Sequence, residues 1–121
     1  MTPRVTELKL HQRSGILEIS FDDGGHHRLT CEYLRVFSPS AEVRGHGPGQ
    51  EVLQTGKEEI TITAIEPVGN YGVKLVFDDG HDTGIYSWGE LHQLATEHQQ
   101  NWQDYLQRLD AAGYQRRSDS M

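Results

Sequence analysis

The tetrapeptide Phe-Asp-Asp-Gly occurs twice, at residues 21–24 and at residues 77–80 of the 121-residue chain. Each copy ends a short run of alternating apolar and polar residues, which is typical of a half-buried β-strand. Aspartate and glycine favour tight turns, because glycine adopts positive φ angles and aspartate hydrogen-bonds to nearby backbone amides. The repeat therefore predicts two β-hairpins of similar build.

The sequence around each copy predicts a meander of three short strands. The strands are expected at residues 5–10, 15–21 and 26–30 in the first meander, and at residues 59–68, 72–77 and 82–86 in the second. A short helical turn is expected at residues 31–37. We therefore predict an α+β fold with a twisted antiparallel β-sheet formed from two small meanders.

The C-terminal part of the chain predicts a helix or a helix pair. Ser87 and Glu90 have the spacing of a capping box, which marks a helix start, and Trp88 heads a series of apolar residues at helical spacing. The polar stretch at residues 96–101 is expected to divide the helix, and Gly113 to end it. We expect one domain over residues 1–115 and a disordered tail over residues 116–121.

The charge of the chain excludes some partners. The formal net charge is −7, with 18 acidic against 11 basic residues, and such a field repels a phosphate backbone. We therefore expect no nucleic-acid binding. The chain has no apolar run long enough to span a membrane and no signal-peptide pattern. Cys31 is the only cysteine, which excludes an intrachain disulfide and fits a reducing cytoplasm.

Residues 38–55 form a long segment rich in glycine and proline without a sustained period, which predicts a loop. Its residues Arg44-Gly45-His46-Gly47-Pro48-Gly49 allow an alternative, an anion held by backbone amides. A stand-alone enzyme is a third alternative, in which Ser38, Ser40 or Cys31 acts as a nucleophile near His46. Neither an oxyanion hole nor an orienting acid can be identified from the sequence.

The two Asp-Asp-Gly turns allow a second interpretation, a metal site. Carboxylate and imidazole groups suit iron, zinc or manganese, and the candidate ligands are Asp22, Asp23, His26, His27, Asp78, Asp79, His81 and, from the loop, His46. The spacing of known metal motifs is missing, so we favour turn chemistry. On that interpretation His81 is a surface turn residue whose replacement by alanine costs about 1 kcal/mol or less.

Several short motifs, taken together, resemble one bacterial family. They are Leu34-Arg35, the stretch from Ser38 to Gly47, Asp79-Gly80-His81 and Tyr86-Ser87-Trp88. Over most of its length, from about Val5 to Gly113, the chain resembles the DUF971 family, which is also described as the γ-butyrobetaine-hydroxylase-like N-terminal domain. The resemblance implies an α+β domain with a twisted antiparallel sheet and a C-terminal helix.

The resemblance also implies where a structural zinc would lie. In carnitine-pathway oxygenases such a domain aids dimer formation and binds zinc through three cysteines and a histidine. These ligands correspond here to Ser38, Ser40, Val43 and His81. Serine hydroxyls and a valine do not replace thiolates, so we expect no zinc. The oxygenase domain is absent from these 121 residues, so no 2-oxoglutarate chemistry is expected.

The sequence thus predicts a small, non-catalytic cytoplasmic interaction or accessory module. The family resembles modules fused to ATPases of iron–sulfur cluster transfer, which suggests a link to iron metabolism. An iron- or other metal-binding accessory protein is the alternative. We expect no cofactor, a protein partner, and a monomer or weak homodimer. The expected interaction residues are Arg35, Ser38, Ser40, Glu42, Arg44, His46 and His81.

Overall fold

The computed structural model describes residues 2–45, 47 and 49–116. Its elements are β1 (Val5–His11), β2 (Ile16–Phe21), β3 (His26–Thr30), α1 (Cys31–Val36), α2 (Ala41–Arg44), β4 (Ile62–Val68), β5 (Gly72–Phe77), β6 (Ile85–Ser87), α3 (Trp88–Thr96) and α4 (His98–Ala111). The predicted α+β fold with two antiparallel meanders and a C-terminal helix pair is confirmed.

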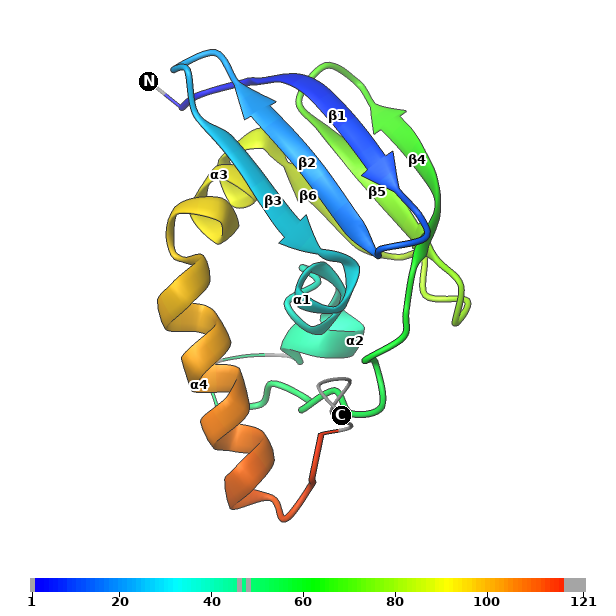
Figure 1. The fold of residues 1–121 in the computed structure, drawn as a ribbon, viewed down its shortest axis with the longest axis vertical. Coiled ribbons are helices and arrows are strands. Elements are labelled where there is room, and N and C mark those ends of the chain that lie inside the picture. Colours follow the sequence, from blue (N-terminus) through cyan, green and yellow to red (C-terminus); the bar gives the residue numbers. More distant parts are fainter. Residues whose placement is uncertain (1, 46, 48, 117–121) are drawn as a thin grey trace.

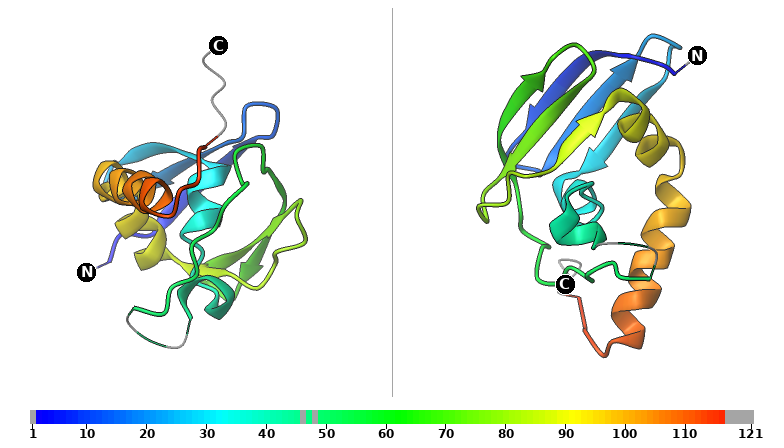
Figure 2. Two further views of the ribbon diagram at one scale, coloured as in Figure 1. Left: turned by 90° about the horizontal axis from the view of Figure 1, so that it is seen from below. Right: turned by 180° about the vertical axis from the view of Figure 1, so that it is seen from behind.

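The six strands form two three-stranded antiparallel sheets, in the orders β1-β2-β3 and β4-β5-β6. The two sheets lie face to face, and α1 and α2 lie at one end of them (Figures 1 and 2). Every second residue of the central strands β2 and β5 is buried, as expected for strands with one face in a core. Residues from both sheets pack in one hydrophobic core together with α1 and α3.

The two Asp-Asp-Gly turns have the same hydrogen bonds. The first aspartate accepts from the residue just before the first strand of its meander: Asp22 from the Arg4 amide at 3.1 Å, and Asp78 from the Thr61 amide at 3.3 Å. The second accepts from the amide two residues on: Asp23 from Gly25 at 2.8 Å, and Asp79 from His81 at 3.1 Å. Gly24 and Gly80 have φ angles of 89° and 87°. The predicted pair of similar hairpins is confirmed.

Helix α3 begins and ends where the sequence indicates. Ser87 and Glu90 form the predicted capping box, and the helix stops at Thr96. Tyr33 of α1 supports this break, because its hydroxyl donates to the Leu94 carbonyl at 2.6 Å and accepts from Asn101 at 3.0 Å. From the break, α4 runs past α1 and away from the sheets (Figure 1).

Two details of the predicted elements differ. The last strand, β6, starts at Ile85 and not at residue 82, because residues 82–84 pass beside the segment that starts at Ser38. The predicted loop at residues 38–55 contains the short helix α2, whose first turn is capped by the Ser40 hydroxyl. A four-residue helix has too few positions to show an apolar period.

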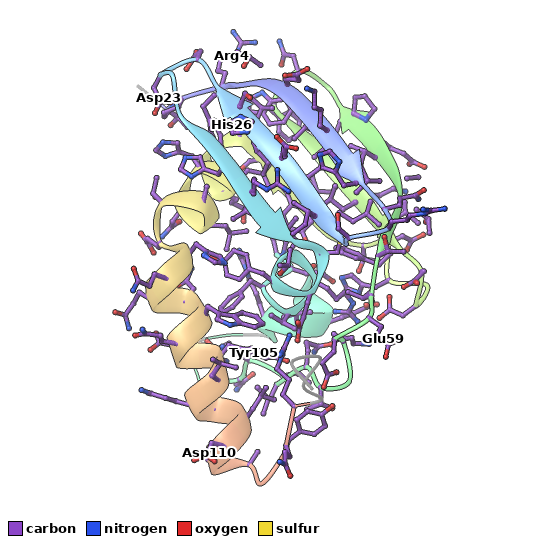
Figure 3. The ribbon with its side chains drawn as sticks, in the orientation of Figure 1. Arg4, Asp23, His26, Glu59, Tyr105 and Asp110 are labelled. Carbon is purple, nitrogen blue, oxygen red and sulfur yellow. The ribbon has the colours of Figure 1, made fainter. Side chains whose placement is uncertain are left out.

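The end of the described chain is bound to the first helix. The side chain of Glu32 in α1 is buried, and Arg116 donates to both of its carboxylate oxygens, at 2.9 Å and 2.5 Å. Tyr105 of α4 (Figure 3) packs in a buried cluster with Val36 of α1 and with Tyr114, and its hydroxyl donates to the Gln54 carbonyl at 2.7 Å. Arg116, which the sequence assigned to the tail, is thus held in place, while residues 117–121 lie outside the described residues.

Candidate functional site

A hydrogen-bond network centred on the buried side chains of Ser38 and His81 joins the start of α2 to the turn after β5. The Oγ of Ser38 lies 2.9 Å from Nε2 of His81, and Nδ1 of His81 lies 3.0 Å from a carboxylate oxygen of Glu42. An ionised carboxylate only accepts hydrogen bonds, which assigns the imidazole proton to Nδ1 and leaves Nε2 to accept from the Ser38 hydroxyl. We call Ser38, Ser40, Glu42, His81 and Thr83 the hydroxyl–histidine network.

Ser40 and Thr83 complete this network. The hydroxyls of Ser40 and Thr83 are 2.7 Å apart, and the Ser40 amide donates to the Ser38 Oγ at 3.2 Å. The Ser40 hydroxyl also accepts from the Glu42 amide at 3.1 Å, which caps α2. The network therefore fixes α2 against the chain that leads into β6.

The same network includes three of the four positions at which the resemblance implied zinc ligands. Ser38, Ser40 and His81 are joined by hydrogen bonds, and Val43 is buried nearby on α2. The donor set does not fit zinc, because the hydroxyls already hydrogen-bond and valine has no donor atom. Within residues 2–45, 47 and 49–116, no group of three or more histidine, cysteine, aspartate or glutamate residues is arranged to hold a metal ion.

Ser38 is fully enclosed. Its exposed fraction is 0%. Gly84 packs so closely against it that a Cβ atom built on Gly84 would lie 2.4 Å from the Ser38 Oγ. The phenol of Tyr86 is also buried nearby and donates to the Leu34 carbonyl at 2.6 Å. The serine hydroxyl is therefore a packed structural donor in this conformation.

An ion-pair cluster lies beside the network. The side chains of Arg35 and Lys57 reach the same oxygen of Asp79, at 3.0 Å and 2.7 Å. Burial opposes ionisation of Asp79, but the bonds from Lys57, the His81 amide and Arg35 outweigh it and lower its pKa to about 2. Among the described residues, Nη1 of Arg35 is a buried nitrogen without a hydrogen-bond partner.

The surroundings of His81 favour its neutral form. Burial lowers its pKa, and the nearby Arg35 guanidinium acts in the same direction, whereas Glu42 opposes both. Only 2% of the His81 side chain is exposed. The expectation that His81 is a surface turn residue is therefore wrong. Sequence reasoning took it for a solvated turn residue because the Asp-Asp-Gly turn before it is polar.

The structure brings most of the predicted interaction residues together but buries many of them. Arg35, Ser38, Ser40 and His81 are buried. The side chains of Glu42 and Arg44 are 64% and 52% exposed, so these two present the site to solvent. His46 lies outside the described residues.

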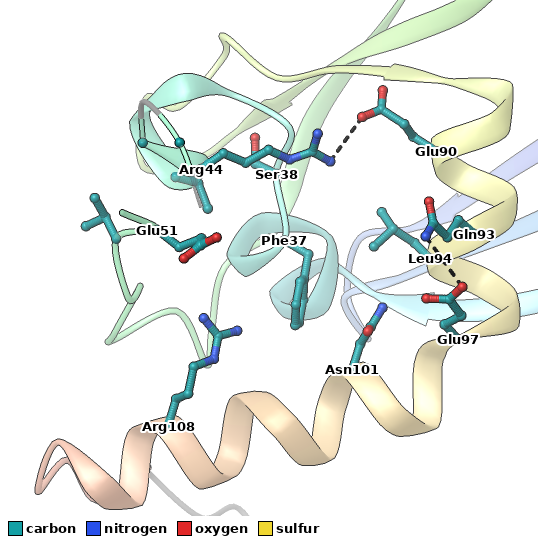
Figure 4. Close-up of a pocket in the computed structure, with 14 residues that line it drawn as sticks. Phe37, Ser38, Arg44, Glu51, Glu90, Gln93, Leu94, Glu97, Asn101 and Arg108 are labelled. Carbon is teal, nitrogen blue, oxygen red and sulfur yellow. Dashed lines mark hydrogen bonds and ion pairs between the residues drawn. The ribbon is translucent and has the colours of Figure 1, made fainter. Parts of the chain in front are cut away.

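A pocket of about 620 Å³ lies between α2, the loop that follows it, and the helices α3 and α4 (Figure 4). Phe37, Val43 and Leu94 supply its apolar surface. Arg44 reaches from α2 to Glu90 of α3, where the two side chains form an ion pair of 3.0 Å. Val43 and Arg44 of α2 line the pocket, which places the network that holds α2 beside the pocket.

Sequence reasoning missed several of these residues. Thr83 and Lys57 gave no signal, because each is a single polar residue in an irregular segment. Arg108 and Glu51, which also line the pocket, looked like ordinary surface residues. Glu90, which also lines the pocket, was identified from the sequence, but as the third residue of α3 in the capping box and not as a pocket residue.

Comparison with known proteins places this site in context. Residues 8–92 match the family described as gamma-butyrobetaine hydroxylase-like, N-terminal. No curated protein matches the chain. Within the described residues, no helix is long and apolar enough to cross a membrane.

The solved structures that are similar to the chain include two NMR structures and one crystal structure. One protein solved by NMR in solution is 59% identical over 95% of this chain and 86% of its own, with a TM-score of 0.82. A second NMR structure is 41% identical over 100% and 98%, with a TM-score of 0.83. A crystal structure of a DUF971-family protein of unknown function from Acidithiobacillus ferrooxidans is 37% identical over 76% and 92%, with a TM-score of 0.64. The chain therefore belongs to the DUF971 family, the gamma-butyrobetaine hydroxylase-like N-terminal family.

Proposed function

We propose that this protein is a non-catalytic interaction module that binds a protein partner through α2 and the adjoining pocket. The observation that supports this most is that Ser38, Ser40 and His81 of the hydroxyl–histidine network are buried whereas Glu42 and Arg44 are exposed. A buried network holds a short helix in a fixed position. Segments held on a rigid scaffold are common places for recognition.

The location in the cytoplasm and the link to iron metabolism remain part of this proposal. The first is supported by the single, buried cysteine, which fits a reducing compartment. The second is supported only by the family resemblance, which is an associational argument.

A specific observation favours a second candidate function. Ser38, His81 and Glu42 are joined in the order of a serine–histidine–acid triad, at 2.9 Å and 3.0 Å, and such triads are recognised by geometry. The enclosure of the Ser38 hydroxyl by Gly84 opposes acyl transfer, because a substrate carbonyl needs access to that oxygen. A fluorophosphonate probe tests this candidate: covalent labelling of wild type that is lost in Ser38→Ala would support an enzyme.

Photo-crosslinking in the native host tests the proposed function. A photoreactive phenylalanine analogue placed at Glu42 should crosslink a defined protein, since this side chain is exposed on α2. The same analogue at Lys9, on the exposed part of β1, serves as the matched control. If both positions capture the same set of proteins, or neither captures any, α2 is not an interaction surface.

A further inference from the structure

We infer that the pocket beside α2 and an adjoining hollow on α4 form one groove that accepts a basic amphipathic segment of the partner. The inference rests on the proposed function, since it names the chemistry of that partner. The adjoining hollow has a volume of about 470 Å³ and shares Phe37 and Arg108 with the pocket of about 620 Å³. Phe37 is thus the common floor of both, and we call them together the Phe37 groove.

The groove has an accessible apolar surface. Val52 lines the groove, and its exposed fraction is 52%. Among the described residues, few other large hydrophobic side chains are exposed. Phe37 is only partly buried against the core, and Leu94 adds a further apolar contact on the opposite side (Figure 4). Apolar side chains of a partner could therefore lose contact with water here, which is the main favourable contribution to association.

Around this surface, negative charge predominates. Glu51, Glu90 and Glu97 line the pocket, and Asp104 lines the hollow. Glu90 is paired with Arg44 at 3.0 Å. Within the described part of the chain, Glu51, Glu97 and Asp104 show no ion pair, and the last two accept only from the amides of Gln93 and Gln100, at 3.4 Å and 3.1 Å.

Arg108 offsets only part of this charge. Its guanidinium lies over the Phe37 ring at 5.7 Å from the centroid, a cation–π arrangement that holds it against the floor. Four carboxylates thus face two guanidinium groups in the groove. A segment that carries lysine or arginine beside apolar side chains complements both features.

The net charge of the chain acts in the same direction. A formal charge of −7 attracts a basic segment over distances of about a Debye length, roughly 10 Å at 0.1 M salt. The length of the groove along α4, from Glu97 to Ala111, corresponds to about 20 Å at 1.5 Å per residue. Three to four turns of a partner helix, with one apolar face, match this length.

The test uses a defined probe. An amidated peptide of about 14 residues, with leucine and lysine at helical spacing, is titrated into the ¹⁵N-labelled protein at about 50 mM salt. The largest shifts are expected at residues that line the groove. A peptide with glutamate in place of lysine should bind at least about tenfold more weakly.

Matched protein variants distinguish peptide binding in the groove from general electrostatic attraction of the peptide to the acidic chain. Glu51→Gln, Glu97→Gln and Asp104→Asn together should weaken peptide binding about tenfold, and Val52→Ser should weaken it severalfold. Glu7→Gln, Glu66→Gln and Asp82→Asn remove the same charge elsewhere and should change binding less than about twofold. Equal losses in both triple variants, shifts centred outside the groove, or full competition by spermidine would overturn the inference.

Crosslinking at Glu42 distinguishes failure of the groove inference from failure of the proposed function. If the partner is still captured at Glu42 by the groove variant that has lost its three carboxylates, α2 binds a partner but the groove is not its basic-segment site. If no specific capture occurs at Glu42 even in wild type, the proposed function itself fails.

Discussion

The hydroxyl of Ser38 is within hydrogen-bond distance, 2.9 Å, of the imidazole of His81, although 43 residues separate them in the chain. This bond crosses from the segment after the first meander to the Asp-Asp-Gly turn of the second. In relatives with cysteines at these positions, the resemblance implies that a metal makes the same connection. Here, a hydrogen bond makes this connection.

The first prediction is that the fold does not depend on zinc. Dialysis against a chelator should leave the thermal midpoint unchanged, because hydrogen bonds already satisfy the side chains of Ser38, Ser40 and His81, and Val43 has no polar group. Differential scanning calorimetry with and without chelator measures this. Zinc that is retained at one equivalent, together with unfolding on chelation, would contradict the prediction.

Restoring thiolates gives the complementary experiment. In a variant with Ser38→Cys, Ser40→Cys and Val43→Cys, the three thiolates and His81 provide a Cys₃His donor set, so the protein should bind one zinc and unfold at a higher temperature. The same triple variant with His81→Ala is the control and should bind zinc more weakly. Equal zinc affinity in both would mean that His81 is not close enough to act as a ligand.

His81→Ala should destabilise the protein by about 2 to 3 kcal/mol, because it leaves the buried Ser38 hydroxyl without its acceptor. The matched control is His26→Ala on the exposed face of β3, which should cost about 0.5 kcal/mol or less. Urea unfolding at neutral pH compares the two. Similar small losses at both positions would show that the network contributes little to stability.

The free energy of unfolding should decrease as the pH falls below 6.5, the ordinary pKa of histidine. Burial lowers the folded-state pKa of His81 and also that of His98. The unfolded chain therefore binds more protons in this window, and the stability present above it is lost as the pH falls. Asp79 adds a second loss between pH 3.8 and about 2.

Urea titrations at about pH 7.5 and about pH 5.5 measure the histidine effect. In His81→Gln the decrease between these two conditions should be smaller than in wild type, while the contribution of His98 remains. An unchanged decrease would assign the effect entirely to other groups.

Gly84→Ala should destabilise the protein by about 1 to 3 kcal/mol, the usual cost of overpacking. The added Cβ would lie 2.4 Å from the Ser38 Oγ, which has no room to move. Gly47→Ala is the control, since no atom lies within 4 Å of a Cβ built there. A neutral effect at Gly84 would show that the packing around Ser38 adapts easily.

Arg116→Gln should cost about 1 to 3 kcal/mol, because the Glu32 carboxylate is buried and would lose a charged double donor. Arg28→Gln, at an arginine whose side chain is 60% exposed beside Glu18, should cost much less. If Glu32→Gln restores stability to the Arg116→Gln variant, the loss came from the unpaired charge. Additive losses in a double-mutant cycle would contradict the pairing.

The sequence predicted the parts of the fold that depend on local chemistry. The Asp-Asp-Gly turns, the capping box at Ser87 and the break near residue 97 each follow from a few adjacent residues. The burial of His81 and the ion pair of Arg44 with Glu90 could not be predicted from adjacent residues, because they depend on how distant segments pack. The resemblance did predict that the Ser38 segment and His81 are neighbours, and this is confirmed.

The groove was not predictable either. The residues that line it include Phe37, Val52 and Arg108, which come from three separate segments of the chain. On the sequence, Arg108 is one polar residue on an exposed helix face. Only its position over the Phe37 ring, at 5.7 Å, gives it a specific environment.

The two meanders also bear on the order of folding. Within each meander, strands pair with their neighbours in the chain, so each pairing closes a short loop and costs little entropy. The bond between Ser38 and His81 closes a loop of 43 residues and can form only when the two meanders have docked. Because contacts between distant residues form slowly, we expect the network to assemble late, so that the candidate binding surface forms only once the two meanders have docked.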